Sequence, residues 1–289
     1  MTDTYPREID IGHLRSWIGR EETATDTVSI DLVHKFNAML DLSSAIPAAG
    51  DVAPLLINYC LAQPVVRNSL LGHDGHPQKG GFLPPVPLPR RMWAGSSLTF
   101  YGDFRVGDAV TRISRIADVA VKDGRSGVLC FVTVEHRSVV DGRLVVEERQ
   151  DIVYREAAAI EGGARAANPA TPAPAGSHGR PVQVDPTLLF RYSALTFNGH
   201  RIHYDQPYAV HVEHYQGLVV HGPLQATLLL NYARELRGSV PKHFIFRGLS
   251  PLFDHDRISL NAQEADGRLK LWTAREGGPV ALSAEAVWG

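Results

Sequence analysis

Several features that would narrow the role of this 289-residue chain are scarce or missing. Its only two cysteines, Cys60 and Cys130, lie in apolar stretches, which favours buried thiols in a reducing compartment over a disulfide. The formal net charge is -2, so no attraction to nucleic acid or anionic lipid is expected. No apolar run approaches the roughly 20 residues of a membrane span, and the N-terminus lacks a signal-peptide pattern. We expect a cytoplasmic protein that binds neither nucleic acid nor membranes.

The length and composition predict two globular domains. With 44% hydrophobic residues, each half of the chain can bury a core of its own. Residues 156–186 are rich in Ala, Pro and Gly and show neither a helical nor a strand period, which is typical of a linker. We therefore expect an N-terminal domain over residues 1–155, a linker over 156–186 and a catalytic C-terminal domain over 187–289.

In each half of the chain, helices are predicted to come first and strands to follow. In the first half, helices are expected over 29–42, with Ser29 as N-cap, and over 53–64. The Gly/Pro-rich stretch 72–89 is too long for a simple connector and is expected to cover or shape a site. Strands rich in β-branched residues, two of their junctions marked by Asp-Gly turns, are predicted over residues 96–104, 108–124, 126–140 and 144–156.

The second half repeats this order around one very apolar helix. Residues 222–236 place Pro223 at the first helical turn and apolar side chains around most of the circumference, so this helix must be wrapped by other structure. Strands with a turn at Asp266-Gly267 are predicted over residues 243–253, 257–267, 269–276 and 280–288. A curved antiparallel sheet around a long helix, occurring twice, predicts an α+β protein with a tandem (double) hot-dog fold.

Five of the thirteen histidines fall between residues 200 and 221. His200/His203 and His211/His214 have H-x-x-H spacing, but the segment is broken by glycine and proline and has no nearby cysteine, so we predict no metal. For His211 and His214 we favour ordinary surface or core positions. His221 directly precedes Gly222 at a helix start, where free N–H groups favour negative charge.

The stretch "SALTFNGHRIHYDQPYA", followed by "HGPLQATLLL", resembles the motif of the MaoC-like double hot-dog hydratases and dehydratases. Residues 16–29, 80–108 and 246–262 resemble the same family, so the likeness spans most of the chain. It implies that His203 is the catalytic histidine and that Gly222 supplies the oxyanion hole. The position of the motif's aspartate holds Asn198, an amide that cannot serve as a base.

The resemblance leaves two assignments of the proton transfer open. In the one we favour, His203 carries the acid/base work and Asn198 holds the water. In the other, a nearby group such as His200, Tyr204 or Asp205 takes the place of the missing carboxylate. His200, Tyr204 and His221 are in either case expected to line the substrate site.

The family resemblance also implies a reaction, the addition of water to an enoyl-CoA thioester, with no cofactor because coenzyme A is part of the substrate. It favours itaconyl-CoA, through mesaconyl-C4-CoA, as the precursor of citramalyl-CoA in itaconate degradation. Such a substrate carboxylate requires a cation. Arg201 is the first candidate, and Arg90 and Arg91 are next, although these two are equally suited to CoA phosphates or to solvent.

Three other functions remain open. The first is a 3-hydroxyacyl-CoA or acyl-carrier-protein dehydratase of fatty-acid type. The second is a hot-dog thioesterase, which is disfavoured because Gln225 stands where its carboxylate would be. The third is a non-catalytic acyl-CoA-binding module, which the amide at Asn198 keeps open. By analogy with other hot-dog proteins we expect a homodimer.

Overall fold

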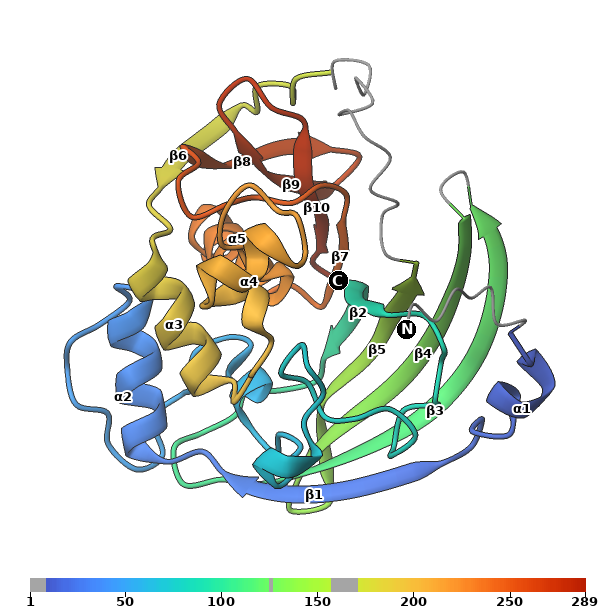
Figure 1. Ribbon diagram of the computed structural model, residues 1–289. Coiled ribbons are helices and arrows are strands. Elements are labelled where there is room, and N and C mark those ends of the chain that lie inside the picture. The colour runs from blue at the N-terminus through green and yellow to red at the C-terminus, as the bar shows by residue number, and fades with distance from the viewer. Residues whose placement is uncertain (1–8, 125–126, 157–170) are drawn as a thin grey trace.

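A computed structural model describes residues 9–124, 127–156 and 171–289, and its strands form one continuous antiparallel sheet (Figure 1). The order across the sheet is β1-β3-β4-β5-β2-β7-β10-β9-β8-β6. The strands are β1 (Glu21–Thr27), β2 (Arg90–Phe100), β3 (Ala109–Gly124), β4 (Gly127–Val140), β5 (Arg143–Arg155), β6 (His178–Val182), β7 (His243–Gly248), β8 (Ile258–Ala265), β9 (Arg268–Arg275) and β10 (Val280–Val287).

The helices are few and mostly short. They are α1 (Ile11–Arg15), α2 (Ile30–Met39), α3 (Pro186–Leu195), α4 (Gln206–His211) and α5 (Gly222–Arg237), with 3-10 turns η1 (Ile57–Cys60), η2 (Asn68–Leu70) and η3 (Arg201–His203). Helix α2 begins as predicted, since the Ser29 hydroxyl accepts a hydrogen bond from the Leu32 N–H at 3.1 Å. None of the helices in the described ranges is both long and apolar enough to cross a membrane.

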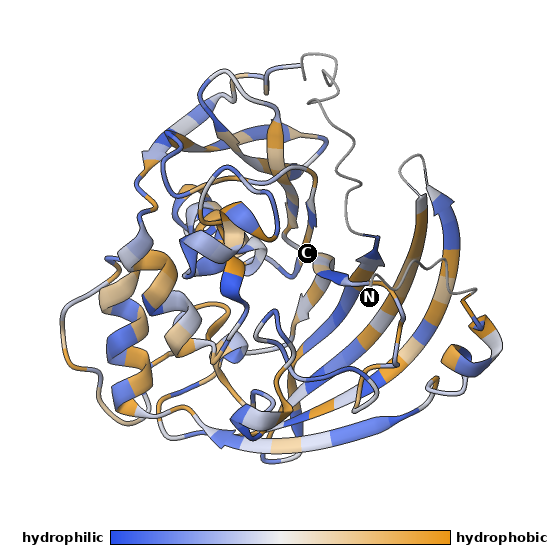
Figure 2. Cartoon of the chain, viewed as in Figure 1, coloured by the Kyte–Doolittle hydropathy of each residue, from blue (hydrophilic) through white to orange (hydrophobic). Residues whose placement is uncertain are grey.

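The strand pattern follows from period-two hydrophobicity and from Asp-Gly turns. Figure 2 shows hydrophobic and hydrophilic residues alternating along β3, β4 and β5. The β4–β5 and β8–β9 hairpins turn at Asp141-Gly142 and Asp266-Gly267, where all four residues have positive φ, as a type I′ turn requires. These predicted turns are confirmed, whereas the one at Asp123-Gly124 leads into residues 125–126, which lie outside the described ranges.

Helix α5 is the core of the C-terminal half. Its faces pack against β8, β9 and β10 and against β2 and β7, and Leu224, Leu229 and Leu230 are fully buried. Each such leucine contributes about 1.5–3 kcal/mol of hydrophobic stabilisation. The prediction of a wrapped helix is therefore confirmed. The surrounding sheet fixes the position of the first turn of α5.

The prediction of a second helix over residues 53–64 is wrong. Only the single 3-10 turn η1 forms there, because Leu56 and Ala62 adopt left-handed backbone conformations and prolines stand at both ends of the segment. No long helix of the described residues therefore fills the curve of β3, β4 and β5. A cavity of about 1500 Å³ lies between this sheet and the C-terminal half.

The two halves share the sheet through the pairing of β2 with β7, in which Ser97 lies opposite Ile245. Gly95 is needed at this join, since a Cβ there would come within 2.3 Å of the Phe246 carbonyl oxygen. The predicted linker over 156–186 is only partly a linker. Its residues 178–182 form edge strand β6 beside β8, and its residues 157–170 lie outside the described ranges. The division into two domains remains a prediction.

Candidate active site

His203 lies on the wall of the cavity with one ring nitrogen fixed. Its Nδ1 donates a hydrogen bond of 2.7 Å to the Val219 carbonyl, which can only accept, so the neutral ring carries its lone pair on Nε2. Nε2 has no protein partner among the described residues and is left for a bound molecule. Burial lowers the pKa of His203 to about 4, which keeps the ring neutral and able to accept a proton.

His221 and Gly222 stand beside this ring at the start of α5. The His221 ring stacks on that of His203, with centroids 3.6 Å apart and planes 18° from parallel, and its Nε2 lies 2.8 Å from the Ser193 hydroxyl. Burial, with the His203 and His200 rings, holds the pKa of His221 well below its ordinary value. A Cβ on Gly222 would point into open space, and the Gly222 N–H is one of the unpaired donors of the first helical turn.

Asn198 reaches the same cavity from the turn that follows α3. The chain reverses at Phe197, whose φ is 49°, and the Asn198 N–H donates to the Ser193 carbonyl at 2.9 Å. The Asn198 side-chain oxygen accepts from the His200 N–H at 3.0 Å, so its amide nitrogen remains available. The turn thus brings Asn198, His200 and His203 to one wall of the cavity.

The three arginines predicted to bind substrate lie in different surroundings. Arg201 donates to the Asp205 carboxylate and to the His73 carbonyl, lies over the Tyr208 ring and is not among the residues that line the cavity. Arg90 lines the cavity but is paired with Glu213 at 2.9 Å.

Arg91 also lines the cavity and, among the described residues, forms no ion pair. Burial lowers the pKa of His76 and of His200, and the Arg91 charge lowers both further, so Arg91 lies within electrostatic reach of these rings. Of the three arginines, Arg91 is the one whose charge is available to a ligand.

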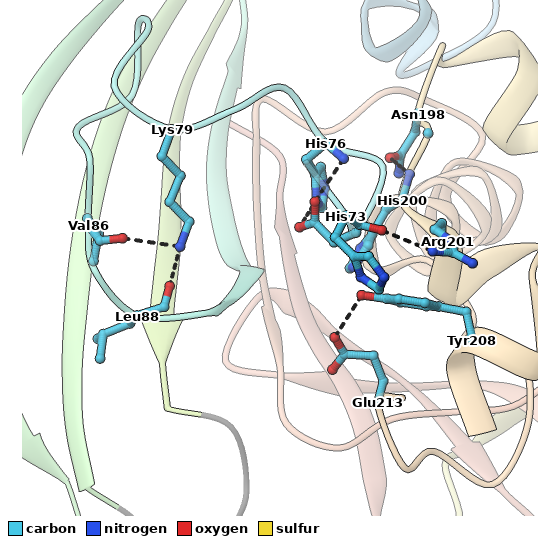
Figure 3. A network of polar contacts seen from close by, with 12 residues as sticks. His73, His76, Lys79, Val86, Leu88, Asn198, His200, Arg201, Tyr208 and Glu213 are labelled. Carbon is cyan, nitrogen blue, oxygen red and sulfur yellow. Dashed lines mark hydrogen bonds and ion pairs between the residues drawn. The ribbon is translucent and has the colours of Figure 1, made fainter. Parts of the chain in front are cut away.

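The loop 72–89 contributes a histidine that sequence reasoning had not singled out. His76 Nδ1 donates to an Asp74 carboxylate oxygen at 2.9 Å, and the centroid of its ring lies 4.1 Å from that of His200 (Figure 3). The His200 ring in turn meets the His203 ring edge-on at 5.4 Å. The prediction that this loop shapes a site could be made from its length and composition, but Asp74 and His76 carry no motif that would mark them.

Asp74, His76 and His200 are also close enough together to be considered for a metal, with one atom of each within 4.8 Å of the others. The hydrogen bond between His76 and Asp74 already occupies a nitrogen and an oxygen of this group, and the nearby Arg91 charge opposes a cation. The three residues are therefore better suited to hydrogen bonding than to holding a metal.

Tyr204 lies at the margin of the cavity, and two further histidines lie outside it. Tyr204 lines the cavity, is 44% exposed and donates to the Gly199 carbonyl at 2.9 Å. His211 ends α4 and His214 has a φ of 58°, and both are exposed. They lie apart from the cavity lining, in agreement with an ordinary surface position.

The far wall of the cavity, on the sheet of the N-terminal half, carries buried polar groups among apolar side chains. The buried Glu148 accepts a hydrogen bond of 3.1 Å from the Tyr59 hydroxyl, and burial raises the pKa of Glu148 to about 7. His136 lies on the neighbouring strand between Ser114 and Gln150, and burial lowers its pKa to about 4. The space left by the missing helix is thus lined by both hydrogen-bonding and apolar side chains.

A curved sheet around a central helix, with a histidine and a glycine N–H at that helix start, defines a hot-dog enzyme of the hydratase type. Residues 57–254 match the family model of hydroxyacyl-thioester dehydratase type 2, and the chain belongs to this family. The predicted enzyme class, a hydro-lyase, is confirmed.

Three known proteins are similar to this chain over most of its length. Mesaconyl-C(4)-CoA hydratase of Chloroflexus aurantiacus is 43% identical over 284 residues, which are 95% of this chain and 97% of that protein. The structure of a MaoC-like dehydratase from Phytophthora capsici superposes with a TM-score of 0.69 at 15% identity, covering 97% of this chain and 99% of that one. A Mycobacterium tuberculosis protein with a double hot-dog fold gives a TM-score of 0.53 at 15% identity, covering 93% and 95%.

These likenesses confirm the predicted resemblance to MaoC-like proteins and the predicted tandem hot-dog fold. The helix of the N-terminal half is the exception already described, because the segment expected to form it is reduced to η1. The roles of the individual site residues stay predictions.

Proposed function

We propose that this protein adds water to a CoA thioester whose acyl group carries a carboxylate beside the double bond, as in itaconyl-CoA and mesaconyl-C4-CoA, to give citramalyl-CoA in itaconate degradation. The observation that carries the proposal is Arg91, a guanidinium on the cavity wall that forms no ion pair within the described ranges. Arginine suits the planar carboxylate, which it can bind through two parallel hydrogen bonds. The similarity to a mesaconyl-C(4)-CoA hydratase supports the same choice.

The chemistry follows from the groups around His203. The His203 Nε2 accepts a proton from water, which attacks the β-carbon of the enoyl group, and such a positioned base contributes roughly 10²–10⁴-fold in rate. The Gly222 N–H donates to the thioester oxygen as negative charge develops on it, a contact worth about 3 kcal/mol in comparable sites. The Asn198 amide nitrogen holds the attacking water.

The far wall places polar side chains among apolar ones, so a polar acyl group would find hydrogen-bond partners there. The proposal needs no cofactor, and a cytoplasmic location and a homodimer belong to it as expectations.

A side-by-side assay of itaconyl-, mesaconyl-C4- and crotonyl-CoA tests the proposal. Hydration of mesaconyl-C4- and crotonyl-CoA is followed by the loss of enoyl-thioester absorbance, that of itaconyl-CoA by chromatography of the product, and thiol release is measured in parallel. We expect hydration of the carboxylated thioesters with a kcat/KM well above that for crotonyl-CoA. Equal or better activity on crotonyl-CoA would instead support the fatty-acid-type dehydratase, release of thiol a thioesterase, and binding without turnover an acyl-CoA-binding module.

A further inference from the structure

We propose that His76, held by Asp74, is a second proton-transfer group of this site, supplied by the N-terminal half, and that it protonates the α-carbon while His203 takes the proton of water. The inference rests on the proposed hydration. It names the donor of the second proton, the one that the α-carbon receives. It accounts for a site in which the motif's carboxylate position holds the amide Asn198.

The loop that carries His76 is docked firmly on the segment that carries His200 and His203. Gly75 meets Gly199 backbone to backbone, since a Cβ on Gly75 would lie 1.9 Å from the Gly199 carbonyl oxygen. The Arg201 N–H donates to the Asp74 carbonyl at 2.9 Å, and the Arg201 guanidinium donates to the His73 carbonyl at 3.1 Å. The Arg201 side chain therefore serves to hold the two loops together (Figure 3).

Asp74 fixes both the position and the tautomer of His76. One carboxylate oxygen accepts from His76 Nδ1 at 2.9 Å and the other from the His76 backbone N–H at 3.0 Å. With Nδ1 directed at Asp74, Nε2 is the nitrogen that remains for a bound molecule, and His76 lines the same cavity as His203. A carboxylate that orients a histidine in this way is the arrangement of many acid/base sites.

The surroundings of the two histidines differ in a way that suits opposite roles. His203 has a carbonyl as its partner and no carboxylate, so the neutral base is favoured. His76 has the Asp74 carboxylate as its partner. A carboxylate favours the imidazolium, which is the form that can donate a proton. Burial and the Arg91 charge lower the pKa of His76 against this effect, and a substrate carboxylate bound to Arg91 would offset the Arg91 contribution.

The step balances with these two rings. The O–H bond of water breaks, its proton passes to His203 Nε2, and the oxygen bonds to the β-carbon. The π electrons move to the thioester enolate at the Gly222 N–H, and the enolate takes a proton from His76 Nε2. The proton on His203 returns to His76 by way of His200, whose ring lies next to both, so that the site is restored.

The test compares the whole chain with three variants, His76→Ala, Asp74→Asn and Asp74→Glu. We expect His76→Ala to lower kcat for mesaconyl-C4-CoA by about 10²–10⁴-fold and added imidazole to restore part of it. Asp74→Asn should lower kcat by up to about 10⁴-fold, as loss of the orienting carboxylate does in a Ser-His-Asp triad, and Asp74→Glu should recover part. In D2O, exchange of the α-hydrogens of citramalyl-CoA should be lost in His76→Ala.

Exposed His211 provides the matched control, because His211→Ala removes an imidazole without reaching the cavity. Thermal unfolding and CoA binding of each variant report on folding and on the remaining site. An active wild type whose His76→Ala variant keeps full kcat and α-exchange would overturn the role of His76 alone. Loss of wild-type activity on adding a chelator would also overturn it, in favour of a metal. A wild type inactive on all three thioesters would refute the proposed function as well.

Discussion

The His203 and His221 rings stack face to face, with centroids 3.6 Å apart, and each is held by a different element. His203 is tied to the Val219 carbonyl and His221 to the Ser193 hydroxyl on α3. Burial lowers the pKa of both rings, to about 4 for His203 and well below the ordinary value for His221, so both are neutral before a substrate reacts. The stack thereby sets the distance between the proposed base and the Gly222 N–H, which directly follows His221 in the chain.

Replacing His203 by Asn should separate catalysis from folding. The Asn side chain is able to keep a hydrogen bond to the Val219 carbonyl while it removes Nε2, so hydration should fall by about 10²–10⁴-fold with little change in the unfolding midpoint. His203→Ala should abolish hydration as well and lower stability further. An unchanged rate in either variant would refute the acid/base role of His203.

Gly222→Ala should leave the fold intact and damage the site. A Cβ at this position meets no atom within 4 Å, so we expect the free energy of unfolding to change by no more than about 0.5 kcal/mol. The new methyl group would occupy the space in which the thioester oxygen must approach the N–H. We expect kcat/KM to fall on the order of 10²-fold, measured by initial rates alongside urea unfolding. Full activity would place the oxyanion elsewhere.

Arg91→Ala should change substrate preference more than overall activity. Loss of a charge-assisted contact worth about 1.5–3 kcal/mol corresponds to about 10–150-fold in kcat/KM for the carboxylated thioesters. Crotonyl-CoA has no carboxylate, so its kcat/KM should stay nearly constant. The exposed Arg257 offers a matched charge deletion, Arg257→Ala, which should leave both substrates unaffected. Equal losses on both substrates would assign Arg91 to coenzyme A instead.

Acid should destabilise the protein through its buried neutral histidines. The pKa of His136 is lowered to about 4, so its contribution to stability is present above pH 6.5 and is lost as the pH falls from there towards 4. Glu148 acts in the opposite sense, because its pKa is raised to about 7 and its contribution is lost as the pH rises from 4.5 to 7. Urea unfolding of the wild type and of His136→Gln isolates the histidine.

Between pH 6.5 and 4 the wild type should lose on the order of 3 kcal/mol more than His136→Gln. Parallel pH profiles for the two proteins would contradict the neutral state of His136.

Gly75→Ala should uncouple the loop 72–89 from the site. Gly75 has a φ of 88° and contacts Gly199 too closely for a Cβ, so both strain and a clash oppose the change. Gly80 in the same loop has a φ of 91° but its nearest neighbour would be 3.6 Å away, so Gly80→Ala carries the strain of about 1–3 kcal/mol without the clash. Gly75→Ala should lose more stability and, unlike Gly80→Ala, should lose kcat.

Much of the fold could be predicted because its signals are local. The Asp-Gly turns, the Ser29 cap and the wrapped helix α5 each follow from a few adjacent residues. The segment 53–64 was mistaken for a helix because its apolar spacing says nothing about the left-handed conformations that Leu56 and Ala62 adopt under tertiary packing. The strand in residues 178–182 was likewise hidden, since Gly179 and Pro181 are poor strand formers that an edge position tolerates.

For the candidate site, the motif predicted His203, Asn198 and Gly222, and these three residues line one cavity. The Asp74–His76 pair could not be found from sequence, because it lies more than a hundred residues away and no local pattern records the contact of Gly75 with Gly199. Arg201 was ranked above Arg91 by its closeness in sequence to the catalytic histidine. Which of the two has a free charge depends on Asp205 and the His73 carbonyl, and that is a property of the folded chain.

The pairing of β2 with β7 makes the two halves of the chain depend on each other. A split chain would leave two unpaired strand edges, each a template for aggregation, and would strip the histidine cluster of the loop pressed against it. Any split, shuffled or circularly permuted version must therefore keep this seam closed, Gly95 included, to keep its strand edges paired and its site complete.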